Sequence, residues 1–137
     1  MNWDSVKNDA QAGLNKMEYN LPLYTPARSL SGGNLQRMVI VRELGLDPHL
    51  IVASYMTRGL DVQSTIAARQ ALLDACQAGA GVLLISEDLD EILELSDRIA
   101  VMCEGRIVGI VKRGEATPEE LGLLMAGVVK EGQGDPA

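Results

Sequence analysis

The sequence predicts an α/β fold in which parallel central strands are flanked by helices and an antiparallel strand pair lies near the carboxyl end. Two short apolar runs at 50–53 and 82–85 are typical of strands in a parallel sheet that is buried on both faces. A helix-like segment follows each run, so right-handed crossovers are expected. A glycine turn inside the apolar stretch 99–111 predicts the antiparallel hairpin.

Composition is consistent with one folded domain. The 137 residues are 47% hydrophobic but only 3% aromatic, so the core must be aliphatic. A net charge of −7 argues against a general nucleic-acid surface. No apolar run approaches the ~18 residues of a membrane span, and no secretory leader opens the chain. We therefore expect a cytoplasmic protein whose Cys76 and Cys103 are buried free thiols.

The expected elements follow from periodicity and from breakers. Apolar spacing predicts a helix over 4–19, two prolines make 20–28 a connector, and the next helix runs from Leu35 to Leu46 before Asp47-Pro48. The remaining predictions are a strand at 50–53, a polar turn at 57–61, a helix at 62–78, a strand at 82–85, a helix at 89–95, hairpin strands at 99–103 and 106–111, a helix that Thr117 caps and that extends to about Val129, and a frayed tail at 131–137.

The run Leu-Ser-Gly-Gly-Asn at 30–34 is the most informative local feature. Backbone amides at Gly32 and Gly33 can approach an oxygen closely, because no side chain is present there. The run also offers the hydroxyl of Ser31 and the amide of Asn34, and the helix that follows adds a positive potential at the same place. Phosphate is the ligand that such a site would take. Taken alone, however, the run favours an ordinary glycine-containing loop before a helix. No G-x-x-x-x-G-K-[ST] loop accompanies it.

Other polar residues have structural interpretations beside functional ones. Asp61 is expected to be a helix N-cap, a role compatible with a functional one. Tyr55 is expected to cover a sheet edge rather than to act as a nucleophile. The acidic cluster at 87–94 is interpreted as a negative first turn and a solvated face rather than a metal site. Arg42 and Arg98 suit ion pairs or carbonyl caps.

Four motifs in order give residues 28–113 a resemblance to the carboxy-terminal half of an ATP-binding cassette (ABC) ATPase, the motor subunit of membrane transporters. The closer resemblance is to the second cassette of tandem-cassette importers for simple sugars or nucleosides. The motifs are the signature run 30–34 with Gln36 and Arg37, the D-loop-like turn Thr-Arg-Gly-Leu-Asp at 57–61, the Ser-Glu-Asp-Leu phrase at 86–89 in the place of the switch-histidine loop, and the phrases at 96–99 and 104–107.

The resemblance implies an incomplete, three-layer core like that of the P-loop NTPases. Residues 1–28 would end the helical subdomain and form a connector, 29–130 would be the carboxy-terminal half of the ATPase core, and 131–137 a flexible tail.

Such cassettes pair head to tail, so the signature run is expected to act in trans on ATP held by another cassette. Ser31, Gly32 and Gly33 would cap the γ-phosphate. Asn34 would lie near the ribose, while Gln36 belongs to the same nucleotide-contacting set. Asp61 would face across the interface between cassettes.

The departures from the family pattern are equally informative. Ser54 and Tyr55 stand where the family carries Asp-Glu, and Glu87 replaces the switch histidine. Hydroxyls cannot orient a hydrated Mg²⁺, and a carboxylate repels phosphate. We therefore expect no catalytic residue and no metal ligand in this chain, which alone would be inactive. ATP and Mg²⁺ would belong to the full assembly.

The resemblance implies the energy-coupling subunit of a sugar or nucleoside importer, with a first cassette and transmembrane permease subunits as partners at the inner face of the cell membrane. Sheet edges left bare predict a homodimer or a swapped dimer in isolation. Two alternatives remain open. One is a non-catalytic interaction module that regulates a partner ATPase. The other is a lobe of a chromosome-maintenance or DNA-repair ATPase, disfavoured by the acidic charge.

Overall fold

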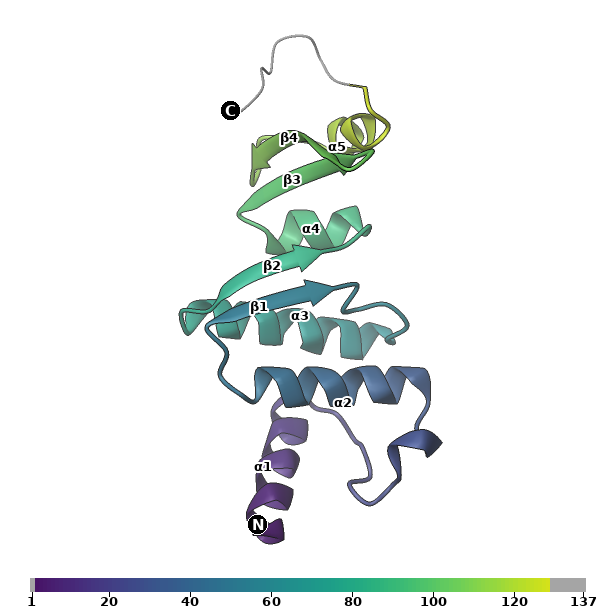
Figure 1. Cartoon of the computed structure of the whole chain (residues 1–137), viewed down its shortest axis with the longest axis vertical. Coiled ribbons are helices and arrows are strands. Elements are labelled where there is room, and N and C mark those ends of the chain that lie inside the picture. The colour runs from purple at the N-terminus through teal and green to yellow at the C-terminus, as the bar shows by residue number, and fades with distance from the viewer. Residues whose placement is uncertain (1, 129–137) are drawn as a thin grey trace. The chain divides into compact units, whose positions relative to one another are not determined.

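The computed structural model describes residues 2–128, which form two compact units that divide between Ile85 and Ser86 (Figure 1). The expected boundary at 28/29 stays a prediction, and the tail 131–137 lies outside the described residues. The first unit contains α1 (Trp3–Lys16), the 3₁₀ turn η1 (Ala27–Ser29), α2 (Gly32–Leu44), β1 (Leu50–Ser54), α3 (Val62–Gln77) and β2 (Gly81–Ile85). The second contains α4 (Leu89–Leu95), β3 (Arg98–Cys103), β4 (Arg106–Lys112) and α5 (Pro118–Met125).

The mixed α/β fold, with one parallel and one antiparallel strand pair, confirms the predicted fold class. In the first unit β1 and β2 pair in parallel, in a register from Leu50 opposite Gly81 to Ser54 opposite Ile85. The helix α3 connects the two strands and lies along one face of the pair (Figure 1). A helical crossover is what two parallel neighbours require, because no tight turn can return the chain to the same end of the sheet.

The core of the first unit lies between its helices and one face of the β1–β2 pair. Alternate strand residues face this core, because successive side chains of a strand point to opposite sides. The buried side chains there are Leu14, Met17, Tyr19, Leu21, Ile40, Ala53, Met56, Ala68 and Leu72, with Ile51, Val82 and Leu84 packed against them.

The opposite face of the strand pair is exposed, so the prediction of strands buried on both faces was wrong. Val52 and Leu83 are register partners and are 60% and 55% exposed. Leu50 and Ile85 lie on the same face and are exposed as well. We call these four residues the open sheet face. An apolar run identifies a strand with two apolar faces, but it does not supply the second covering layer.

The helix α2 begins at Gly32, three residues before the expected start, because Ser31 caps it. It ends at Leu44, where the amide of Gly45 donates to the carbonyl of Val41. The backbone of Asp47 then takes a positive φ of 46°. The glycines at the start of α2 are therefore helical residues whose amides belong to its first turn.

In the second unit β3 and β4 form the predicted antiparallel hairpin. Its turn residues, Glu104 and Gly105, have φ values of 49° and 77°, the combination that a tight hairpin turn requires. The helix α5 packs against the hairpin through Leu121, which is almost fully buried.

The helix α5 ends at Met125, short of the expected end near Val129, which lies outside the described residues. Gly127 takes a φ of 78° and its amide donates to the carbonyl of Leu124, while the amide of Val128 donates to the carbonyl of Leu123. This paired arrangement is the Schellman motif, which terminates a helix at a left-handed residue.

Two interpretations of polar residues need correction. Glu91 is fully buried in α4, so the acidic cluster is not wholly a solvated face. Asp88 caps this helix, because its side chain accepts hydrogen bonds from the amides of Asp90 and Glu91. Cys76 and Cys103 are free, as expected, yet Cys76 is exposed and Cys103 is only partly buried.

Candidate nucleotide-contacting site

The amino-terminal end of α2 is open to solvent. The Ser31 side chain accepts a hydrogen bond from the amide of Asn34 at 3.3 Å, and its carbonyl accepts one from Leu35 at 2.9 Å. The amides of Gly32 and Gly33 are therefore the first-turn donors left for an external acceptor, since no intrahelical carbonyl precedes them. Ser31 and Gly32 are exposed, and Gly33 is partly exposed.

The electrostatics of this helix end favour an anion. The first turn of α2 carries no acidic side chain. The helix dipole adds partial positive charge at the same place, and an exposed terminus lets a ligand reach it. A Cβ built on Gly32 would meet nothing within 4 Å.

The turn at 57–61 packs against the same helix end. A Cβ on Gly33 would lie 3.2 Å from the carbonyl oxygen of Gly59, so a side chain at position 33 would force the turn to move by a few tenths of an ångström. Gly59 itself has a φ of 78°. The side-chain amide of Gln36 donates to the carbonyl of Met56 at 2.8 Å. Gln36 therefore holds the segment that leads from β1 into this turn.

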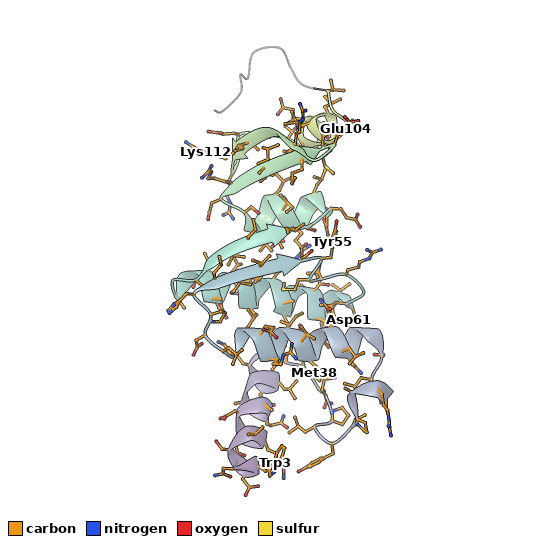
Figure 2. The ribbon with its side chains drawn as sticks, viewed as in Figure 1. Trp3, Met38, Tyr55, Asp61, Glu104 and Lys112 are labelled. Carbon is orange, nitrogen blue, oxygen red and sulfur yellow. The ribbon has the colours of Figure 1, made fainter. Side chains whose placement is uncertain are left out.

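Arg37 joins the signature run to Asp61, although it was not among the predicted site residues. Its guanidinium forms an ion pair with the Asp61 carboxylate, and its Nη1 donates to Oδ1 of Asn34 at 3.1 Å. The guanidinium carbon also lies 5.6 Å from the ring centroid of Tyr19. Figure 2 shows Asp61 at the beginning of α3, beside α2. The three-residue spacing of Asn34 and Arg37 is the sequence signal that could have identified the pair.

Asp61 caps α3, as expected. Its carboxylate accepts a hydrogen bond from the amide of Ser64 at 2.8 Å. Hydrogen bonding from Ser64 is the main cause that lowers the pKa of Asp61, and the Arg37 charge lowers it further. Burial raises the pKa of the Tyr19 phenol, although the Arg37 charge opposes that rise. The phenol donates to the carbonyl of Ser64 at 3.2 Å, so Tyr19 and Asp61 hold the same turn of α3.

The three positions that were expected to depart from the family pattern are all exposed. Ser54 ends β1, and Tyr55 follows with a φ of 49°, its amide donating to the carbonyl of Ile85 at 2.9 Å. Tyr55 leaves 43% of its surface to solvent. Glu87 belongs to the second unit, just before α4.

A magnesium ion does not fit the Ser54–Tyr55 position. Mg²⁺ prefers carboxylate and phosphate oxygens in an octahedral arrangement, whereas this position offers neutral hydroxyls. Among residues 2–128 no group of three or more His, Cys, Asp or Glu side chains is placed to hold a metal ion. A phosphate at the start of α2 does fit, because two amides and the Ser31 hydroxyl face solvent there.

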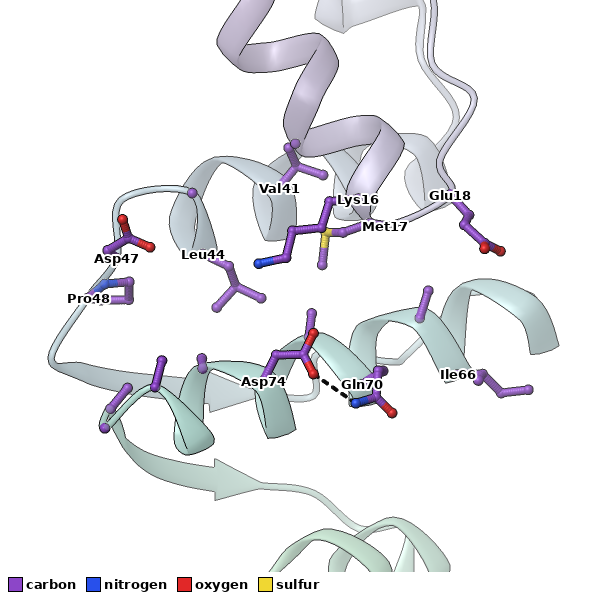
Figure 3. A pocket seen from close by; sticks show the side chains of 18 of the residues that line it. Lys16, Met17, Glu18, Val41, Leu44, Asp47, Pro48, Ile66, Gln70 and Asp74 are labelled. Atoms are coloured by element: carbon purple, nitrogen blue, oxygen red, sulfur yellow. Dashed lines mark hydrogen bonds between the residues drawn. The ribbon is translucent and has the colours of Figure 1, made fainter.

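A cavity of about 780 Å³ lies elsewhere in the first unit (Figure 3). It is formed by the ends of α1 and α2 and by α3, with Lys16, Leu44 and Gln70 among its lining residues. Figure 3 shows the Gln70 amide bonded to the Asp74 carboxylate across one turn of α3. None of the sequence-predicted site residues lines this cavity.

The fold matches solved ABC cassettes. One ATP-binding subunit of an ABC transporter superposes with a TM-score of 0.77 at 22% identity, over 88% of this chain and 54% of the solved chain. A cassette solved as a dimer gives 0.73 at 24% identity over 82% of this chain and 49% of its own. No family model matches the chain. In fold and sequence, the chain matches part of the ABC transporter ATP-binding proteins.

Within that class, the chain is similar to several import proteins. The guanosine import ATP-binding protein NupO of Bacillus subtilis is 50% identical over 111 residues, which are 81% of this chain and 22% of NupO. The glucose import ATP-binding protein TsgD13 of Haloferax volcanii is 50% identical over 101 residues, 74% of this chain and 18% of TsgD13. The ribose import ATP-binding protein RbsA 2 of Rhizobium meliloti is 41% identical over 103 residues, 75% and 20% respectively. The chain thus spans about a fifth of the length of these relatives.

No helix within residues 2–128 is long and apolar enough to cross a membrane.

Proposed function

We propose that this chain is the part of an importer's energy-coupling subunit that supplies the signature run, in trans, to ATP bound by another cassette. The importer would carry simple sugars or nucleosides, as the names of the relatives indicate. One observation supports the proposal most strongly. The start of α2 presents two glycine amides and a serine hydroxyl to solvent, with no acidic side chain in that first turn.

Each residue of the site has a role in this proposal. Gly32 and Gly33 would donate backbone hydrogen bonds to the γ-phosphate, and Ser31 would add its hydroxyl. Asn34 would contact the ribose side of the nucleotide, and Asp61 would face the interface between cassettes. Gln36 would act indirectly, because its amide already donates to Met56.

The chain itself would not hydrolyse ATP. Ser54 and Tyr55 offer no carboxylate to place Mg²⁺ or to polarise water, and Glu87 would repel a γ-phosphate at its position. One competent site, on the partner cassette, would then drive transport. The complete assembly would contain a first cassette and permease subunits at the cytoplasmic face of the membrane.

The test is ATP turnover by the purified chain alone and after mixing with a purified cassette that carries its own phosphate-binding loop. We expect no turnover by the chain alone and an increase in turnover on mixing. Ser31→Ala should reduce the increase, because it removes a ligand hydroxyl together with the helix cap. Thr117→Ala is the matched control, since it removes a cap hydroxyl from α5 in the second unit. Turnover by the chain alone at ordinary ATPase rates would refute the proposal.

The open sheet face supports a second part of the proposal, self-association of the isolated chain. Leu50, Val52, Leu83 and Ile85 expose apolar surface on one side of a sheet that, within residues 2–128, has only the strands β1 and β2. We expect a homodimer or a swapped dimer by light scattering at high concentration. A monodisperse monomer there would contradict it.

A further inference from the structure

The orientation of the Asn34 side chain is fixed by the chemistry of its neighbour. Arg37 Nη1 donates to Oδ1 of Asn34 at 3.1 Å. A guanidinium has five donors and no acceptor, so only the oxygen end of the amide can face it. The Nδ2 group, with both of its hydrogens, must therefore point away from Arg37. Asn34 presents donors, and no acceptor, on that side.

Arg37 is itself held from several sides. Asp61 pairs with its Nη2, and the ring of Tyr19 lies beneath the guanidinium. Both supports are anchored in turn: the Asp61 carboxylate accepts from the amide of Ser64, and the Tyr19 phenol donates to the carbonyl of the same residue. Tyr19 is almost fully buried. The guanidinium is thus held by the start of α3 and by Tyr19, which follows α1, as well as by Asn34 of its own helix.

The helix end and the turn at 57–61 therefore behave as one body. The Gly33–Gly59 approach and the Gln36–Met56 hydrogen bond add two further links between them. Arg37 is the link that also reaches a side chain of the signature run. A lysine could not replace it, because one ammonium group cannot present the planar fork that spans Asn34 and Asp61.

We propose that Arg37 is a positioning residue that locks the Asn34 amide so that the signature run offers a hydrogen-bond donor, and that the nucleotide group received there is an acceptor oxygen. This inference rests on the proposed function for the identity of the ligand. The lock itself is a property of this chain alone.

The first experiment needs no nucleotide. In the ¹⁵N-labelled full chain, nuclear Overhauser effects should place the Nδ2 hydrogens of Asn34 away from the Arg37 guanidinium. Arg37→Ala should allow the amide to rotate and should speed hydrogen exchange of the Leu60 amide, which donates to Thr57, by about tenfold. Arg37→Lys should not restore either signal. Arg42→Ala is the control on the same helix, because Arg42 pairs with exposed Glu43.

The second experiment measures ATP turnover by the chain mixed with a competent cassette. Asn34→Asp keeps an oxygen for Arg37 but replaces both donors by a charged oxygen, so the slow exchange at Leu60 should remain. Turnover should nevertheless fall, by about tenfold or more, with the loss expressed mainly in KM for ATP. Arg37→Ala should lower turnover too, and Arg42→Ala should leave it unchanged.

The outcomes separate this inference from the proposed function. If the unmodified chain never raises turnover, the proposed function fails, while the magnetic resonance data still decide whether Arg37 locks the amide. Nδ2 hydrogens found beside the guanidinium, or exchange at Leu60 that is unchanged in Arg37→Ala, would overturn the lock. Full turnover by Asn34→Asp would overturn the role of the donor.

Discussion

A hydroxyl side chain caps both α2 and α5, but the two helices differ in which first-turn amides remain available to a ligand. Ser31 accepts from the amide of Asn34 at 3.3 Å, and Thr117 accepts from that of Glu120 at 3.2 Å. In α5, however, the Glu120 carboxylate accepts in return from the Thr117 amide, and Pro118 removes another donor. The start of α5 is thus satisfied by its own side chains.

The comparison shows that a cap does not by itself make an anion site. The first turn of α5 carries two carboxylates, which cancel the positive end of the helix dipole and repel an anion. The first turn of α2 has Gly33 and Asn34 at the corresponding positions and no acid. What makes α2 a candidate site is the absence of groups that would use or block its amides. The following variants test this difference, from the largest expected effect to the smallest.

Asn34→Glu gives α2 the capping box that α5 already has. The new carboxylate would accept from the Ser31 amide and would place negative charge beside the phosphate position. We expect the increase in turnover on mixing with a competent cassette to fall by about a hundredfold or more, since both a donor and the local potential are lost. The free energy of unfolding should not decrease. Urea titration followed by circular dichroism checks the second point, and turnover at normal levels would contradict the comparison.

Gly33→Ala and Gly32→Ala should change the free energy of unfolding in opposite directions. At position 33 the new methyl lies 3.2 Å from the Gly59 carbonyl, so the turn must shift and the free energy of unfolding should drop by about 1 kcal/mol. At position 32 the methyl meets nothing within 4 Å, and the lower entropy of the unfolded chain should stabilise by about 0.5 kcal/mol. Chemical denaturation of both variants measures this. Equal destabilisation would show that the close approach at Gly33 does not matter.

Thr117→Ala removes the cap of α5 without touching the first unit. We expect a loss of about 1 kcal/mol in the unfolding free energy of the second unit, the ordinary cost of an N-cap hydroxyl. ATP turnover of the mixture should be unchanged. Hydrogen exchange at the amides of α5 reports the local effect. A fall in turnover with this variant would mean that effects of Ser31→Ala cannot be assigned to the helix end of α2.

The smallest expected effect is a pH dependence of the free energy of unfolding, which Asp61 causes. The folded chain lowers the pKa of this carboxyl below its ordinary value of about 3.9. Its contribution to stability is therefore complete above that ordinary value, and it is lost as the pH falls through the lower folded pKa. Asp61→Asn should flatten this part of the curve of unfolding free energy against pH between about 5 and 2. Identical acid limbs in the two proteins would contradict the assignment.

Local rules predicted most of the elements. The apolar runs located β1 and β2, and the capping rules alone identified Asp61 and Thr117 as helix starts. The candidate site at 30–34 was predicted only through the family resemblance, because no local pattern distinguishes a phosphate-binding helix start from an ordinary loop.

What the sequence missed depends on contacts between distant residues. Arg37 meets Asp61 across 24 positions, and nothing in the local pattern of α2 selects that partner. The burial of Glu91 follows from packing within the second unit rather than from its charge. The exposure of Val52 reflects how few elements cover the strand pair, which an apolar run cannot reveal.

The open sheet face also bears on how the chain behaves during synthesis. Leu83 and Ile85 complete this face as soon as β2 has left the ribosome and joined β1. An apolar surface of this kind is what holdase chaperones bind and what drives nascent chains into aggregates. The soluble yield of the chain in a cell should therefore depend on chaperone supply more steeply than its own folding stability would indicate.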